Sequence, residues 1–295
     1  MRRRLAWGVL LALAVPVSCR TTQGDTRSSS LHSCPDRRAV EAFVADLEAG
    51  RASRGFGNRL SLADAECVRR ALVRELPRAL GSVIGYKAAF TNRAAQERNG
   101  LTAPSWGVMF SRHMLESGTT MSARFGARPH FEPDLIMVVK DAGLSEAATP
   151  LDALRHIAAV VPFIELPDLM LDGKPPGPAL IAINIGFRGG ILGRPVEVEA
   201  TQQFLDALGS MTVVMTEDVS GRELARATGS KLMGHPVNVV MWLVQAIKEE
   251  GGSLKPGDLL SLGSFVPPAP TEAGTSITVR YVGMPGDPSV TVHFR

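Results

Sequence analysis

Residues 132–139 read EPDLIMVV, a stretch in which two acids precede an uninterrupted apolar run. Five consecutive apolar residues after a proline and an aspartate predict a buried β-strand over Leu135–Val139. Residues i and i+2 of an extended chain point to the same face, and Pro133 favours an extended conformation at Glu132. We therefore expect the carboxylates of Glu132 and Asp134 to project together at the mouth of a buried strand.

A third acid ends another apolar run. Val160–Ile164 predicts a second strand, and Glu165 follows it directly. Burial of a carboxylate is costly unless a cation or a hydrogen-bond donor meets it. Three carboxylates from two strand ends, with waters as further ligands, would suit Mg²⁺, Mn²⁺ or Ca²⁺. The alternative is that each acid is a solvated strand end.

Lys87 is the only charged residue in the apolar run Val83–Phe90. A lone lysine in such a run either extends its amine to water or occupies a pocket. A buried lysine beside a metal ion can polarise a carbonyl group or move protons. The residues of this run alone leave both readings open.

The remaining pattern predicts an α+β protein. Apolar residues at helical spacing predict a first helix over residues 36–48, and a capping box at Ser61 and Asp64 predicts the start of a second. A late helix is expected to begin near Pro236 and to end at Gly251. Further strands are expected at Leu180–Ile185, Thr212–Met215, Ile277–Val282 and Ser289–Phe294. We expect a small helical region over residues 34–80 and a mixed α+β domain over 81–295.

The N-terminus resembles an export signal. Three arginines precede thirteen residues without a charge (5–17), a length that fits a secretory h-region better than a membrane-spanning helix. Small residues before Cys19 are typical of bacterial lipoprotein signals. We expect a signal peptide over 1–18, lipidation at Cys19 and a polar tether over 19–33. Ordinary secretory cleavage to the periplasm and an uncleaved anchor remain alternatives; the expected membrane contact is the N-terminal anchor alone.

Composition narrows the functional classes. The chain has 295 residues, of which 45% are hydrophobic and 21% charged, which excludes global disorder. Its formal net charge of +3 equals the three arginines at positions 2–4. No basic stripe with interleaved aromatics remains, so we expect no nucleic-acid partner.

Export would place the cysteines in an oxidising compartment. If Cys19 is lipidated or removed, Cys34 and Cys67 form an even pair. A bridge between them would stabilise the fold by roughly 3–4 kcal/mol on the chain-entropy model. The alternative is two free, buried thiols.

Taken together, the segments over residues 36–295 resemble the hydratase/decarboxylase branch of the fumarylacetoacetate hydrolase superfamily. The resemblance rests on the order and spacing of several short motifs, none of which is very specific alone. They are Gly85-Tyr86-Lys87 continuing to Thr91, Trp106–Phe110, Glu132-x-Asp134, Glu165 with Asp168, Gly234–Asn238, Leu254–Asp258 and Gly263-Ser264.

The resemblance implies a mixed β-roll around a pseudo-barrel with a small N-terminal helical region. It implies Mg²⁺ or Mn²⁺ held by Glu132, Asp134 and Glu165, with Ca²⁺ as a third candidate. The implied substrate is a short 2-oxo or 2-hydroxy-dienoic acid that chelates the ion, and Lys87 would assist proton transfer. The oligomeric state, including a homo-oligomer, stays open.

The resemblance also implies substrate-binding residues, and the chain departs from the family among them. The implied residues are Asp168, Asn184 and Ser264, and Arg188 is expected to supply a substitute anion-binding group where the chain departs from the family. Ile183 stands where the family has an acid, Phe187 replaces a polar residue, and Asp134 stands where Glu is usual. Two alternatives to a hydratase or decarboxylase therefore remain: a non-catalytic exported binding protein, and an acylpyruvate-type C–C bond hydrolase, which needs a water-activating His–Glu pair.

Overall fold

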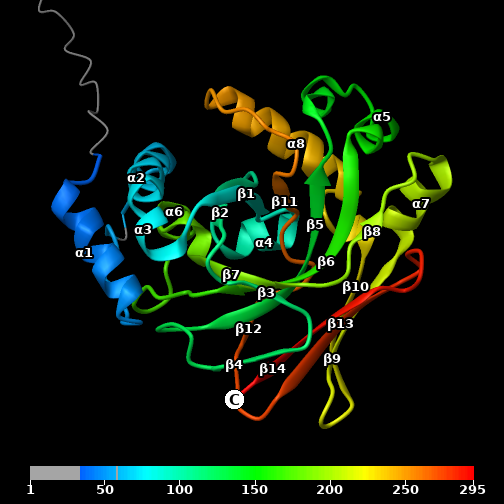
Figure 1. The fold of residues 1–295 in the computed structure, drawn as a ribbon. Helices are drawn as coiled ribbons and strands as arrows, with labels where there is room; N and C mark the ends of the chain where they lie inside the picture. Colours follow the sequence, from blue (N-terminus) through cyan, green and yellow to red (C-terminus); the bar gives the residue numbers. More distant parts are fainter. Residues whose placement is uncertain (1–33, 58) are drawn as a thin grey trace, which may run out of the picture. The chain divides into compact units, whose positions relative to one another are not determined.

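Two β-sheets form the framework of the computed structural model, which describes residues 34–57 and 59–295 (Figure 1). The larger sheet has the strand order β2-β1-β11-β5-β6-β7-β3, with β12 paired to β5 and β8 to β6. Its strands are β1 (Val83–Ala89), β2 (Ser105–Phe110), β3 (Met114–Glu116), β5 (His130–Val139), β6 (Ile157–Pro167), β7 (Phe187–Leu192), β8 (Val196–Glu197), β11 (Leu259–Ser261) and β12 (Ala269–Pro270).

The smaller sheet has the order β10-β9-β13-β14-β4. Inward positions of β13 alternate with outward ones, and the side chain of Tyr281 is fully buried. This alternation confirms the two half-buried strands expected near the C-terminus. The strands are β4 (Thr119–Met121), β9 (Thr212–Glu217), β10 (Arg222–Thr228), β13 (Ser276–Val282) and β14 (Ser289–Phe294).

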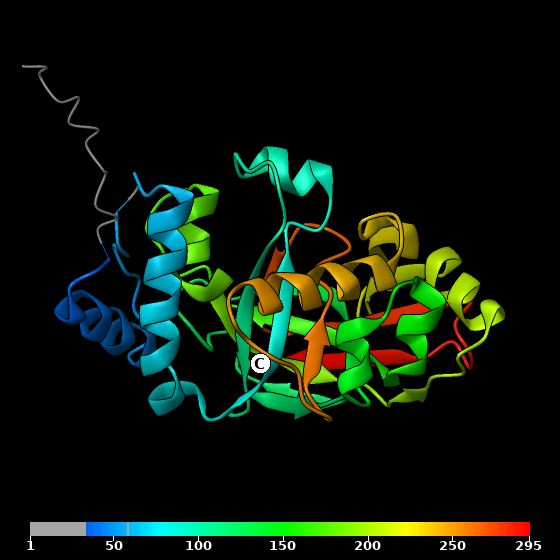
Figure 2. The same ribbon diagram turned by 90° about the horizontal axis from the view of Figure 1, so that it is seen from above.

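Helices lie on two sides of the larger sheet. Figures 1 and 2 show the N-terminal helices beside α6 on one side, and α5, α7 and α8 on the other. No helix in the described part of the chain is long and apolar enough to span a bilayer. The helices are α1 (Arg37–Glu48), α2 (Leu62–Glu75), α3 (Pro77–Leu80), α4 (Arg93–Arg98), α5 (Pro150–Arg155), α6 (Gly177–Ala182), α7 (Gln202–Ser210) and α8 (Pro236–Glu249), with short 3₁₀ turns η1 (Ala142–Glu146), η2 (Asn184–Gly186) and η3 (Gly229–Lys231).

One segment expected as a strand is helical in the structure. Residues 180–185, expected as a strand, instead span the end of α6 and most of η2. The proline-rich entry before this segment explains the difference, because a proline stands in the first turn of α6, where its missing N–H costs nothing. Ile181 and Ala182 then bury their side chains in a cluster with Ala65 and Val68 of α2. The apolar run is thus one face of a short buried helix.

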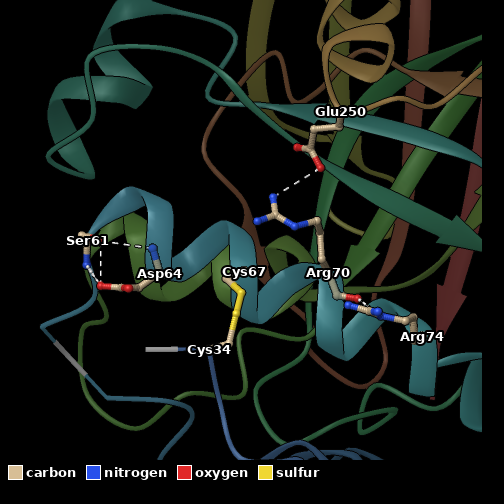
Figure 3. Close-up of a disulfide and its surroundings, with 7 residues drawn as sticks. All are labelled: Cys34, Ser61, Asp64, Cys67, Arg70, Arg74 and Glu250. Carbon is tan, nitrogen blue, oxygen red and sulfur yellow. Dashed lines mark hydrogen bonds and ion pairs between the residues drawn. A yellow bond between two sulfur atoms is a disulfide. The ribbon is translucent and has the colours of Figure 1, made fainter. Parts of the chain in front are cut away.

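A disulfide and a capping box fix the start of the described chain (Figure 3). Cys34 lies just before α1 and Cys67 lies within α2, and the structure joins them with Cα atoms 5.6 Å apart. Ser61 caps α2: its Oγ accepts from the Asp64 amide at 3.1 Å, and the Asp64 carboxylate accepts from the Ser61 amide at 3.3 Å. The predicted capping box is confirmed.

Ion pairs attach α2 to the body of the protein. Arg69 is almost fully buried, stacks 4.0 Å from the Trp106 ring and pairs with Glu250 at the end of α8. Arg70 reaches the same carboxylate at 3.6 Å (Figure 3). Because Cys67 stands one turn or less from these arginines, the disulfide fixes α1 to a helix that is itself anchored.

Reduction of the Cys34–Cys67 bridge should therefore lower stability without disturbing the strands. The loop between the cysteines spans 33 residues, so its loss should cost roughly 3–4 kcal/mol and lower the melting temperature by roughly 5–10 °C. Thermal denaturation with and without reductant measures the effect. A Cys34→Ser/Cys67→Ser variant should not respond to reductant. Two free thiols in a non-reduced digest of exported protein would contradict the bridge.

Candidate active site

Three acids come together because of the register of β5 and β6. Glu132 pairs directly with Glu165 across the antiparallel ladder, and Asp134 lies two residues further along β5. Side chains of directly paired residues lie on the same face, and so do those of residues i and i+2. The three carboxylates therefore share one face of the larger sheet. Asp134 and Glu165 are buried, and Glu132 is partly buried.

Lys87 joins this face from β1. Its ammonium group forms an ion pair with Glu165 Oε1, and the two side chains are only 2% and 1% exposed. The same ammonium lies 3.4 Å from the carbonyl oxygen of Ile185, a residue with a left-handed φ of 53°. The lysine in the apolar run is thus buried among acids, so the alternative in which it extends to water is wrong.

Asp134 is held rigidly in place. Its Oδ2 accepts from Ser261 Oγ at 2.5 Å, and its Oδ1 accepts from the Leu262 amide at 3.1 Å and from the Leu135 amide at 2.5 Å. The buried Tyr281 hydroxyl donates to the Asp134 carbonyl oxygen. Side chain and backbone of this acid are therefore both oriented by the protein.

Burial and mutual repulsion alter the protonation of the acids. Burial, followed by the charge of Glu165, raises the pKa of Asp134 to about 7, although hydrogen bonds from Ser261 and Leu135 and the charge of Lys87 act in the opposite direction. Burial and the Glu165 charge likewise raise the pKa of Glu132 well above its ordinary value, and the Lys87 charge opposes them. An additional cation among these groups would relieve the repulsion.

The carboxylate oxygens of the three acids are suitable ligands for a hard divalent cation. All three side chains offer carboxylate oxygens, which Mg²⁺ and Mn²⁺ prefer. Glu165 Oε2 is buried and accepts no hydrogen bond from the described residues, so it is an oxygen without a partner. Within residues 34–57 and 59–295, no three His, Cys, Asp or Glu side chains already surround a common point at metal-ligand spacing. In the structure the Lys87 ammonium supplies the positive charge at Glu165 Oε1.

A cavity of about 270 Å³ opens beside Glu132. Apolar side chains such as Phe90, Leu169 and Phe265 form much of its wall, and Ser264 contributes a hydroxyl. Such a cavity is typical of small-molecule sites, in which a few polar groups orient a ligand within an apolar enclosure. Ser264 is therefore the one expected substrate-binding residue that lines the cavity.

The other three expected substrate-binding residues do not line this cavity. The Asp168 carboxylate accepts from the Ala127 and Arg128 amides at 3.0 and 2.7 Å. Asn184 exchanges two 2.8 Å hydrogen bonds with the backbone of Val108. Both side chains are thus used to join segments of the fold.

Arg188 is also turned away from this cavity. Its guanidinium donates to the Leu47 carbonyl oxygen at 2.8 Å and lines a separate, smaller pocket beside His113. Burial lowers the pKa of the Arg188 guanidinium and the pKa of the His113 imidazole. For His113, the positive charges of Arg188 and Arg112 lower the pKa further. Ile183 and Phe187, the two departures from the family pattern, are packed into the apolar cluster beneath α1.

Sequence reasoning missed several residues of the site. Ser261 binds Asp134, Tyr281 supports it from the second sheet, and Thr91 lines the cavity with a buried hydroxyl that has no partner among the described residues. Each carries a weak signal, a polar group at a buried position of an apolar run. Which residue the polar group contacts depends on strand pairing, and a local sequence pattern does not specify that pairing.

Metal affinity should rise with pH through about 7. Asp134 ionises near that value, and its protonated form must lose its proton before the carboxylate can bind a cation. Affinity for Mg²⁺ should therefore increase by up to about tenfold per pH unit below 7 for each proton released. Isothermal titration at several pH values measures this. An affinity that is constant between about pH 6 and pH 8 would contradict the assignment.

Curated relatives of this chain include a decarboxylase and a hydratase. No family model matches the chain. The 4-oxalocrotonate decarboxylase of a Pseudomonas species is 26% identical over 195 residues, which cover 66% of this chain and 73% of that protein. The 2-keto-4-pentenoate hydratase 1 of Dechloromonas aromatica is 25% identical over 256 residues, which cover 83% and 94%.

Solved structures share the fold. The 4-oxalocrotonate decarboxylase of Pseudomonas putida G7, complexed with magnesium and adipate, matches with a TM-score of 0.77 and 22% identity over 88% of this chain and 97% of that chain. The fumarylpyruvate hydrolase of Pseudomonas aeruginosa, in complex with Mn²⁺ and pyruvate, matches with a TM-score of 0.53 and 18% identity over 71% and 89%. These similarities confirm the predicted α+β architecture and the resemblance to the hydratase/decarboxylase branch of the fumarylacetoacetate hydrolase superfamily.

Proposed function

We propose that this chain is a divalent-metal-dependent lyase that hydrates or decarboxylates a short 2-oxo or 2-hydroxy-alkenoic acid such as 2-hydroxypenta-2,4-dienoate. The observation that carries the proposal is the convergence of Lys87 with Glu132, Asp134 and Glu165 beside a small, largely apolar cavity. Similarity to decarboxylases and hydratases, and to solved structures with magnesium or manganese, supports it.

The three acids would hold Mg²⁺ or Mn²⁺. When bound, such an ion stabilises negative charge that develops on an oxygen of the substrate. The buried Lys87 ammonium would hold a proton close to the reacting atoms and exchange it with the substrate as the dienol becomes a ketone. The apolar wall would limit the access of water other than the molecule that adds. Asp134, whose carboxylate accepts three hydrogen bonds, would remain in a fixed position in the site.

One observation favours a non-catalytic binding protein as the second candidate. Ile183 and Phe187, which stand where the family has polar residues, are packed in an apolar cluster and offer no polar group to a substrate. The third candidate, a C–C bond hydrolase, lacks support from the cavity, because none of the histidines in the described ranges lines it. His130, the nearest in sequence to Glu132, is within 2.8 Å of the Arg128 carbonyl oxygen.

A spectrophotometric screen distinguishes the three candidates. Dienols and acylpyruvates are offered with Mg²⁺ or Mn²⁺, and products are identified. A lyase should consume dienols and yield the hydrated acid or carbon dioxide. Consumption of acylpyruvates alone would favour the hydrolase, and tight metal binding without turnover of any compound would favour the binding protein.

We further propose that the mature protein is exported and tethered to a membrane through Cys19. The support is the arginine-rich start, the thirteen uncharged residues and the small residues before Cys19. These residues lie outside the described part of the chain.

Cys19→Ser should move the protein from the membrane fraction to the soluble fraction. The reason is that a serine at this position accepts no lipid. Fractionation followed by N-terminal sequencing measures this. A wild-type protein that is already soluble and starts at another residue would contradict the tether.

A further inference from the structure

A second, smaller pocket lies on the face of β6 and β7 that is turned away from the acids. Residues of β3, β4, β6 and β7 line it, together with His113 and Phe125. Glu165 faces Glu132 across the β5–β6 ladder, and Leu166, the next residue of β6, lines this pocket. Successive side chains of a strand point to opposite faces. The pocket is therefore separated from the three acids by the sheet itself.

We propose that this pocket is a binding site for a short-chain monocarboxylate, held by Arg188 and His113. The volume of the pocket is about 70 Å³. One water-sized group needs about 10–15 Å³, so the pocket holds roughly five such groups, which is about the size of propionate. The inference does not depend on the proposed lyase chemistry.

A β-bulge directs Arg188 to the pocket. Leu166 pairs with Gly189 and Pro167 pairs with Phe187, so Arg188 is the extra residue on β7. An extra residue in one strand bends that strand locally and changes the direction of its side chain. The bulge thus accounts for a charged side chain on a strand whose other positions are apolar or glycine.

Arg188 retains hydrogen-bond donors for a ligand. A guanidinium group has five N–H donors, and in the described chain only Nη1 of Arg188 has a partner, the Leu47 carbonyl oxygen at 2.8 Å. Burial lowers the pKa of this guanidinium, and the charges of Asp168 and Glu48 oppose that shift, although neither acid forms an ion pair with it. Arg188 therefore offers an unpaired charge that is partly shielded from water, where charge-assisted hydrogen bonds are strong.

The backbone holds His113 against β7. The Gly190 amide donates to the His113 carbonyl oxygen at 3.0 Å, and a Cβ at Gly189 would lie 2.4 Å from the same oxygen. The His113 imidazole has no hydrogen-bond partner in the described chain, and it is exposed, so it lies at the mouth of the pocket. Burial and the charges of Arg188 and Arg112 lower its pKa. Even a neutral imidazole keeps one N–H that a carboxylate accepts.

Apolar side chains form the rest of the wall. They belong to Leu115, Met121, Phe125 and Leu166, of which Leu166 is only 1% exposed. A strongly hydrated anion such as phosphate would lose water against these side chains without gaining hydrogen bonds in return. A short alkyl chain gains free energy from the same contacts. The wall therefore favours a carboxylate with an alkyl tail over an inorganic anion.

A titration followed by NMR tests the site. Propionate is added to the protein, and the imidazole C–H signal of His113 is recorded; the signal is identified by its absence from His113→Gln. We expect a saturable shift of equal size with and without Mg²⁺, because the pocket and the three acids lie on opposite faces of the sheet. Propionamide, which has the same shape but no charge, should cause no shift. Chloride and phosphate should bind at least about tenfold more weakly than propionate.

Two variants remove the site in different ways. Arg188→Met should weaken propionate binding at least about tenfold, because the charged donor is lost. Met121→Phe should abolish saturation by filling the pocket without altering its charge, and it leaves the Arg188 contact with α1 in place. Arg128→Met is the matched control: Arg128 also donates to backbone carbonyl oxygens, those of Leu171 and Gly173, but does not line the pocket. It should bind propionate as the wild type does.

Several results would overturn the inference. Propionate that leaves the His113 signal unchanged would do so, as would propionamide or chloride that shifts the signal as strongly as propionate. Folded Arg188→Met or Met121→Phe protein that binds propionate as tightly as the wild type would also overturn it. None of these results bears on the lyase proposal, which is tested by turnover of a dienol.

Discussion

Replacing Lys87 with methionine is expected to lower kcat for the dienol by about 10²- to 10⁴-fold while divalent-metal binding survives. Methionine preserves the length and apolar stem of the side chain but cannot carry a proton. It also releases Glu165 Oε1 from the ion pair. The freed carboxylate remains a ligand, so calorimetry should still detect Mg²⁺ binding when turnover has nearly vanished.

The same substitution should change stability in a metal-dependent way. Removing one partner of a buried ion pair costs about 3–5 kcal/mol, because the other charge is left uncompensated. The Lys87→Met protein should therefore melt earlier than wild type without metal and recover when Mg²⁺ is added. Lys248→Met, at an exposed lysine paired with Glu146, should change neither property. A Lys87→Met protein that retains kcat within a few-fold would show that the lysine is not catalytic.

Substitution of Asp134 should have the largest effect on metal affinity. Asp134→Asn preserves the shape of the side chain, so the Leu262 amide and Ser261 can keep hydrogen-bond partners, but it removes the negative charge. Loss of residues that merely support metal ligands already lowers affinity 10- to 100-fold, so loss of a ligand charge should cost roughly 100-fold or more. Asp134→Ala should bind as weakly and be less stable, since it also leaves Ser261 unpaired. Calorimetric titration with Mg²⁺ or Mn²⁺ measures each affinity.

Asp168→Asn provides a control matched for burial. Asp168 is 1% exposed, and its carboxylate accepts hydrogen bonds from the Ala127 and Arg128 amides and not from Lys87. Its substitution should lower stability and leave metal affinity within a few-fold of wild type. An Asp134→Asn protein that binds metal as well as the Asp168→Asn protein would remove Asp134 from the site.

The local part of the site could be predicted from the sequence. The two-residue spacing of Glu132 and Asp134 implies a shared face, because the period of an extended strand is a property of the backbone. The position of Glu165 at the end of an apolar run indicates a carboxylate whose burial costs free energy. That it faces Glu132 depends on the β5–β6 register, which no local pattern contains.

The rest of the site depends on packing between distant segments. Asn184 and Asp168 carry polar atoms that could bind a substrate, yet each is used by backbone groups of segments more than thirty residues away. Ser261 reaches Asp134 only because β11 lies beside β5. The segment expected as a strand at 180–185 failed for a related reason: its apolar residues fit a helix packed on α2 as well as they fit a strand.

The most direct test of a metal-dependent lyase site is turnover of a 2-hydroxy-dienoate by protein treated with chelator and then supplied with Mg²⁺. The dienol is followed by its ultraviolet absorbance in the wild type and in Glu165→Gln, which alters the acid that contacts Lys87. We predict no turnover after chelation, full recovery on adding Mg²⁺ or Mn²⁺ to the wild type, and no recovery in Glu165→Gln. Turnover that is unaffected by chelator, or a metal-loaded wild type that consumes no 2-oxo-alkenoate, would contradict the account.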